Sequence, residues 1–214
     1  MTSIGYGRAR LAEVPKDFWY PTRLSAVWPT TREIISQVLK RLAEFGITSP
    51  DLLPSTNSLI PLFALHHYWS KSPEYRFGEA LRWFLLANQD GRYSGSPITS
   101  LNEDIRAIAE ATGPQSALES LLGRLRVSSE IPAERFLDRY DRAGARFFRL
   151  MLYLVLFDRE APDWVDRTHL GYDKTGSAIM AGFEPQWHHI YPRNVLKKAG
   201  VPDDEIQALA NITV

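Results

Sequence analysis

Residues 132–157, PAERFLDRYDRAGARFFRLMLYLVLF, carry the longest regular apolar pattern in the 214-residue chain. Apolar side chains recur there mainly at intervals of three or four residues, which places them on one face of an α-helix. They are Phe136, Tyr140, Ala143, Phe147, Leu150, Met151 and Leu154. The spacing predicts a single long helix from Pro132 to about Phe157.

Shorter helices are predicted upstream of this stretch. Two should begin at capping boxes, Thr30-Thr31-Arg32-Glu33 and Ser100-Leu101-Asn102-Glu103, where a hydroxyl and a carboxylate each accept a hydrogen bond from a free backbone N–H. The first of these should end at Gly46, and apolar spacing predicts other helices over about 56–69, 72–88 and 115–125. The predicted fold class is mainly α, with residues 1–160 forming an all-helical domain, a multi-helix bundle.

The last quarter of the chain has a different composition. Glycines and prolines interrupt residues 162–192 at irregular intervals, so we expect loops and short extended pieces there. Pro202-Asp203-Asp204-Glu205 is typical of a helix start, and the β-prone residues Asn211-Ile212-Thr213-Val214 predict a strand. Residues 161–214 are therefore predicted to form a separate, loop-rich segment.

Composition excludes several classes of protein. Lys plus Arg and Asp plus Glu number 25 each, so the formal net charge is zero and any anion-binding surface must be local. Cysteine is absent, which excludes disulfides, thiolate zinc sites and cysteine nucleophiles. The longest apolar run, residues 150–157, is shorter than the ~20 residues of a membrane span. We expect a cytoplasmic protein with no membrane partner.

The strongest candidate for chemistry is the segment Trp187-His188-His189-Ile190-Tyr191-Pro192. In an extended backbone adjacent side chains point to opposite sides, so His188 and His189 can serve two different tasks. One imidazole can bind a metal, while the other, with an ordinary pKa near ~6.5, can accept a proton from water that attacks a phosphodiester. The alternative is that both rings only form hydrogen bonds with the backbone of a loop.

Two motifs in this part of the chain resemble a known family. Residues 187–196, WHHIYPRNVL, and residues 208–214, ALANITV, resemble the HNH segment of the GmrSD-type modification-dependent restriction endonucleases. In that family a His-His-Ile-Phe-Pro stretch ends the first strand of a ββα-metal finger, and an Asn-Leu-Thr stretch begins the second strand. This chain has Tyr191 and Ile212 where Phe and Leu are common.

The resemblance implies a role for each matching residue. His189 matches the general base, His188 matches the first ligand of Mg²⁺ or a similar divalent cation, and Asn211 matches the residue that braces the loop and orients the base. The implied activity is hydrolysis of DNA phosphodiesters, with modified DNA as one candidate substrate. An ordinary strand-edge residue is the alternative for Asn211.

The resemblance also implies that this finger is incomplete. The family's finger continues past its second strand into a helix that supplies the last metal-site residue, whereas this sequence ends at Val214. Because affinity requires several well-placed ligands, we expect the 214 residues to bind metal poorly and to cleave DNA slowly or not at all. Family members usually begin with a ParB-like nucleotide-hydrolysing domain, which is the expected partner domain in a longer parent protein.

A row of arginines marks the predicted long helix. Spacings of 4, 3, 4 and 3 residues would align them on one helical face as a positive ridge for successive DNA phosphates. They are Arg135, Arg139, Arg142, Arg146 and Arg149. The alternative is a solvated flank whose charge Asp138 and Asp141 partly neutralise. If the histidines serve only for packing, the chain would instead be a non-catalytic helical module that binds DNA or a protein through this row.

Overall fold

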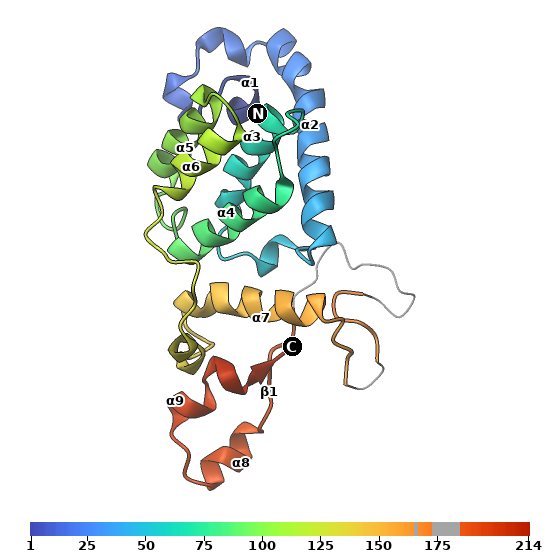
Figure 1. Cartoon of the computed structure of the whole chain (residues 1–214), viewed down its shortest axis with the longest axis vertical. Helices are drawn as coiled ribbons and strands as arrows, with labels where there is room; N and C mark the ends of the chain where they lie inside the picture. Colours follow the sequence, from blue (N-terminus) through green and yellow to red (C-terminus); the bar gives the residue numbers. More distant parts are fainter. Residues whose placement is uncertain (165–166, 173–184) are drawn as a thin grey trace. The chain divides into compact units, whose positions relative to one another are not determined.

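The computed structural model describes residues 1–164, 167–172 and 185–214, and it is mainly helical (Figure 1). The prediction of a mainly α fold is thereby confirmed. The chain divides into two compact units, one of residues 1–41 and 55–128 and the other of residues 42–54 and 129–214. This division differs from the predicted boundary near residue 160, because residues 129–160 belong to the same unit as the carboxy-terminal segment.

The first unit is built from helices joined by short turns. Its central helix, α3, has the sequence LIPLFALHHYW, which is apolar around most of its circumference and so is typical of a helix buried on several sides. α3 packs against α1, α4, α5 and α6, and Leu62, Ala64 and Leu65 are completely buried. The helices are α1 (Thr2–Gly5), α2 (Pro21–Glu44, of which residues 42–44 are counted in the second unit), α3 (Leu59–Trp69), α4 (Phe77–Asp90), α5 (Ile98–Glu110) and α6 (Pro114–Leu122).

Two predicted helix starts are wrong. Thr30–Glu33 lies inside α2, which already begins at Pro21, and Ser100–Glu103 lies inside α5, which begins at Ile98. Within a helix, a threonine hydroxyl can bond the carbonyl four residues earlier instead of capping an end. Thr31 does so, since its Oγ1 donates to the carbonyl of Val27 at 3.0 Å.

The predicted end of the first helix is confirmed at Gly46. α2 ends at Glu44, and Gly46 has a φ of +90°, in the left-handed region that favours glycine. A Cβ atom at Gly46 would lie 2.7 Å from Cδ1 of Phe157, so the backbone also approaches α7 (Arg146–Asp158) too closely for a side chain. Both residues belong to the second unit.

The predicted long helix over 132–157 is interrupted. Residues Ala133–Leu137 and Ala143–Ala145 form short 3-10 turns, and the α-helix α7 begins only at Arg146. Between the turns the backbone pairs with the carboxy-terminal segment, because Tyr140 N donates to the carbonyl of Gln207 at 2.9 Å and Leu209 N donates to that of Asp138 at 2.9 Å. These tertiary hydrogen bonds replace helical ones.

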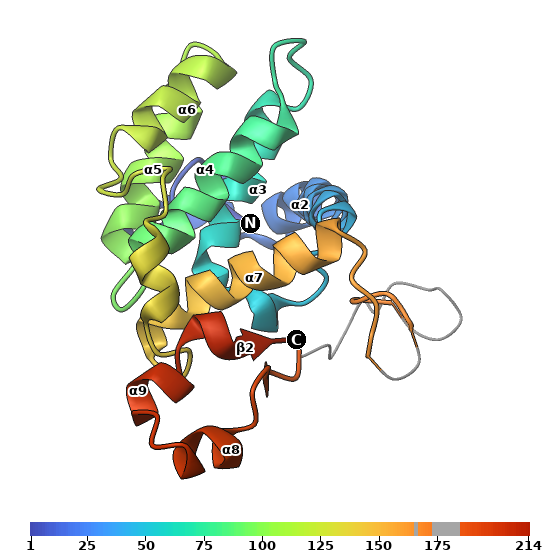
Figure 2. The ribbon, with the colours of Figure 1, turned by 60° about the horizontal axis from the view of Figure 1, so that its bottom comes forward.

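The carboxy-terminal segment of the second unit forms a small antiparallel hairpin with an inserted helical part (Figure 2). Its elements are β1 (His188–His189), α8 (Arg193–Lys198), α9 (Asp203–Ile206), a 3-10 turn (Leu209–Asn211) and β2 (Ile212–Thr213). The predicted helix start at Pro202 and the predicted carboxy-terminal strand are confirmed. Among the helices that the structure describes, none is both long and apolar enough to cross a membrane.

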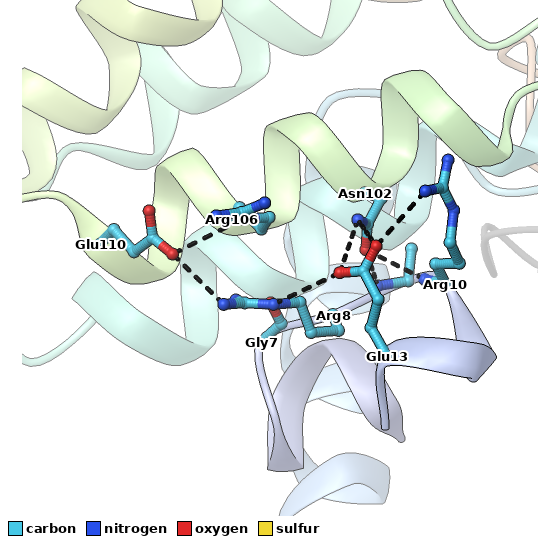
Figure 3. A network of polar contacts seen from close by, with 8 residues as sticks. Gly7, Arg8, Arg10, Glu13, Asn102, Arg106 and Glu110 are labelled. Atoms are coloured by element: carbon cyan, nitrogen blue, oxygen red, sulfur yellow. Dashed lines mark hydrogen bonds and ion pairs between the residues drawn. The ribbon is translucent and has the colours of Figure 1, made fainter. Parts of the chain in front are cut away.

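In the first unit, the side chain of Asn102 on α5 holds the segment of residues 7–13 (Figure 3). Its Oδ1 accepts from the backbone N–H groups of Ala9 and Arg10, each at 3.0 Å, and its Nδ2 donates to the Glu13 carboxylate at 3.0 and 3.1 Å. Arg8 adds ion pairs to Glu13 and Glu110 at 3.7 and 3.3 Å. One buried amide therefore satisfies two backbone donors that no helix or strand supplies with a partner.

Replacement of Asn102 by alanine tests this arrangement. We expect Asn102→Ala to lower the free energy of unfolding by about 1–3 kcal/mol, because it removes the acceptor of two part-buried backbone donors and the donor to Glu13. Urea denaturation followed by circular dichroism measures the change. The control is Arg106→Ala on the same helix, whose half-exposed side chain makes one ion pair to Glu110 at 3.6 Å and should matter little. Equal stability of the two variants would contradict the role given to Asn102.

Candidate functional site

The two candidate histidines lie on β1 and face the strand that follows Asn211. His188 is paired with Thr213 and His189 with Ile212, and Ile190 N donates to the carbonyl of Asn211 at 2.8 Å. His188 is exposed and His189 is half-buried, which fits the alternation of side chains along a strand. The structure thus brings together the three residues singled out in the two motifs, His188, His189 and Asn211.

Asn211 ties the loop after the histidines to the start of β2. Its Oδ1 accepts from the backbone N–H of Tyr191 at 3.0 Å, while its Nδ2 donates to the carbonyl of Ile206 at 3.0 Å and to that of Tyr191 at 3.4 Å. The side chain is buried, so the loss of these bonds would leave polar groups without water to replace them. The Asn211 side chain therefore connects the loop after the histidines to the segment before β2, while its role in orienting a catalytic base stays a prediction.

Two residues that the sequence analysis did not single out contact the ring of His189. The Nε2 atom of His189 lies 3.0 Å from Oε1 of Gln207, and the ring of Tyr140 meets the imidazole edge to face, with 5.7 Å between centroids. Tyr140 belonged to the apolar stripe of the predicted helix, and Gln207 has no motif around it. No local signal in the sequence marks either residue as a neighbour of His189.

The predicted single ridge of arginines is wrong, because the helix that would carry it is interrupted. Arg135 is on a 3-10 turn, pairs with Asp138 at 3.2 Å and lies over the ring of Phe148 at 4.9 Å. Arg139 and Arg142 lie between the turns, and only Arg146 and Arg149 are on α7. The binding-module alternative therefore loses the common helical face on which it was based.

Arg139 is part of an ion cluster that joins the segment of residues 138–141 to α9. Its guanidinium contacts Asp141 at 2.8 and 3.0 Å and reaches Asp203 and Asp204 at 2.9 Å each. These hydrogen bonds raise the pKa of Arg139 and lower the pKa of Asp141 and of Asp203. A β-bridge between Arg139 and Ala208 holds the same two segments together.

The arginines of α7 lie beside the residue that precedes the histidines. The Arg149 guanidinium is 5.8 Å from the ring centroid of Trp187, within the range of a cation–π contact. A small pocket of about 70 Å³ lies at this place. It is lined by Asp51, Leu52, Arg146, Arg149, Leu150, Pro185 and Trp187. Contact of DNA phosphates with Arg142, Arg146 or Arg149 stays a prediction.

The described residues supply few donors for a metal ion. Within 1–164, 167–172 and 185–214, no group of three or more His, Asp or Glu side chains is placed to hold one. His188 contributes a single imidazole at the exposed side of the hairpin. Because a divalent cation needs several ligands, this donor set does not by itself make a Mg²⁺ site.

Comparison with known proteins returned no matching family model, no matching curated protein and no matching solved structure. The resemblance to the GmrSD-type endonucleases therefore rests on the two motifs themselves.

The bracing role of Asn211 leads to a stability prediction. Asn211→Ala should lower the free energy of unfolding by about 1–3 kcal/mol, since it leaves the Tyr191 N–H and the Ile206 carbonyl without their side-chain partner. Denaturant unfolding measures the loss, and backbone NMR shifts of residues 188–191 report on the hairpin. Asn194→Ala, at an exposed position of α8, is the matched control and should be neutral. A neutral Asn211→Ala variant would show that its hydrogen bonds are not needed.

Substitutions of the two arginines between the 3-10 turns, Arg139 and Arg142, should have different effects on thermal stability. Arg139→Glu places a fourth carboxylate among three and should lower the thermal midpoint by a few degrees, whereas Arg142→Glu at an exposed position should not. Since Arg139 lowers the pKa of Asp141 and Asp203, its stabilisation is fully present above the ordinary carboxyl pKa of ~3.9 and is lost as the pH falls from there through the lowered pKa of each carboxyl group. Thermal melts at neutral and acid pH measure both effects, and equal melting of the two variants would refute the cluster's role.

Proposed function

We propose that this chain carries the first part of the catalytic finger of an HNH-type endonuclease that hydrolyses DNA phosphodiesters. One observation carries the proposal: the His188-His189 strand is paired with the strand that begins after Asn211, and the Asn211 amide is bonded to the loop directly after the histidines. The same two motifs that resemble the GmrSD-type family are thus adjacent in space, although Tyr191 and Asn211 are 20 positions apart in the sequence.

In the proposed reaction His189 acts as the general base. It removes a proton from a water molecule, the water oxygen forms a bond to phosphorus, and the bond from phosphorus to the departing sugar oxygen breaks. The position of His189 supports this role, because its ring is half-buried and held by Gln207 and Tyr140 rather than free to rotate. A positioned base of this kind typically contributes about 10²–10⁴ in rate.

His188 is proposed as one ligand of a divalent cation such as Mg²⁺. When bound, the cation would stabilise negative charge on the phosphate. His188 alone does not complete a site, so the proposal requires further ligands besides this imidazole. A ParB-like nucleotide-hydrolysing domain is proposed as the partner on the same resemblance, and a cytoplasmic location is proposed from the composition of the chain.

The test is DNA cleavage by the longest natural protein that contains these residues. Supercoiled plasmid with Mg²⁺ should be nicked or cut, and His189→Ala should reduce the rate by about 10²–10⁴. His169→Ala is the matched control, because His169 is an exposed histidine of the same unit and should leave the rate unchanged. Full cleavage by the His189→Ala variant would refute the proposed function.

A further inference from the structure

Gln207 is a buried polar residue whose side chain is directed at the proposed base. It is 4% exposed, and its Oε1 lies 3.0 Å from Nε2 of His189. Buried polar side chains normally have hydrogen-bond partners, and this partner is the imidazole. The contact joins two residues that are 18 positions apart in the sequence.

The backbone on either side of Gln207 is fixed by three separate hydrogen bonds. Gln207 N donates to the carbonyl of Asp203 at 3.0 Å, and the Gln207 carbonyl accepts from Tyr140 N at 2.9 Å. Leu209 N donates to the carbonyl of Asp138 at 2.9 Å. The side chain therefore starts from a rigid position, and its reach to His189 is not a chance rotamer on a mobile loop.

Tyr140 restricts the same imidazole from another direction. Its ring stands at 88° to the ring of His189 with centroids 5.7 Å apart, an edge-to-face arrangement that is favourable for aromatic pairs. Tyr140 is itself held by the backbone bond to Gln207. Rotation of the imidazole would break the hydrogen bond and the ring contact together.

The chemistry of the amide decides which ring nitrogen holds the proton. An amide oxygen only accepts hydrogen bonds, so a bond from His189 Nε2 to Oε1 of Gln207 requires the proton on Nε2. In a neutral imidazole the other nitrogen, Nδ1, then has a free lone pair. A general base needs such a lone pair on the side of the attacking water.

We propose that Gln207 is a positioning residue, which holds His189 in the tautomer protonated at Nε2 and leaves Nδ1 as the nitrogen that accepts the proton from water. The tautomer rests on the orientation of the Gln207 amide, which turns its oxygen toward Nε2, whereas its catalytic meaning rests on the proposed function. Tyr140 supports the same orientation.

The tautomer is measured on the 214-residue chain without metal. Histidine rings labelled with ¹⁵N are observed by NMR at mildly alkaline pH, where an ordinary imidazole is neutral. His189 should be protonated on Nε2 and unprotonated on Nδ1. His188, whose side chain has no hydrogen bond within the part of the chain that the structure describes, is the internal reference and should show a mixture of tautomers. A His189 ring protonated on Nδ1 in the unmodified chain would overturn the inference.

Two substitutions separate positioning from packing. Gln207→Met keeps the length of the side chain without its acceptor, and it should give His189 the mixed tautomers of His188. Gln207→Glu keeps an acceptor oxygen and should retain the Nε2 proton. A single unchanged tautomer in the folded Gln207→Met variant would overturn the inference, because packing alone would then set the ring.

Cleavage assays distinguish this inference from the proposed function. In the natural protein, Gln207→Met should lower kcat by about 10- to 100-fold, as loss of a partner behind a functional imidazole commonly does. Gln207→Glu should retain more activity. If His189→Ala abolishes cleavage but Gln207→Met leaves it intact, the positioning role fails and the function stands. If His189→Ala has no effect, the function fails, while the tautomer of His189 is still decided by NMR.

Discussion

The carboxy-terminal part of the second unit depends on the amide of Asn211. A primary amide offers both an acceptor and a donor, and Asn211 uses them on the Tyr191 N–H and the Ile206 carbonyl. The ladder between β1 and β2 contains only two residue pairs, and two-stranded hairpins of this size are marginal in water. The buried side chain therefore adds hydrogen bonds to those of the short ladder, and it fixes the loop after the histidines relative to β2.

A second constraint brings the neighbours of His189 into place. The segment of residues 138–141 gives up helical hydrogen bonds and pairs instead with residues 207–209, and the Arg139 ion cluster joins it to α9. Tyr140 and Gln207 reach the imidazole as a result. Three segments distant in the sequence thus meet at one ring, which is the arrangement expected where a side chain must be oriented rather than merely buried.

Most of the correct predictions of secondary structure came from local sequence patterns. The mainly α class, the end of α2 at Gly46, the helix start at Pro202 and the strand after Asn211 all follow from the conformational preferences of a few adjacent residues. The capping-box patterns at Thr30 and Ser100 predicted helix starts that are wrong. Threonine, serine and glutamate also occur inside helices, where the backbone N–H groups are already bonded. A short motif cannot tell whether a helix has already begun upstream.

By itself, the sequence determined which residue types were available: two adjacent imidazoles, an asparagine ahead of a β-prone end, and no cysteine. Tertiary structure alone decided that residues 138–141 leave the helix, that Arg139 serves an ion cluster rather than a ridge, and that Gln207 meets His189. The physical reason is that the apolar spacing of a segment depends only on that segment's own residues. The backbone hydrogen bonds of Tyr140 and Leu209, by contrast, have partners about 70 residues away. No local sequence pattern shows that these distant bonds replace helical ones.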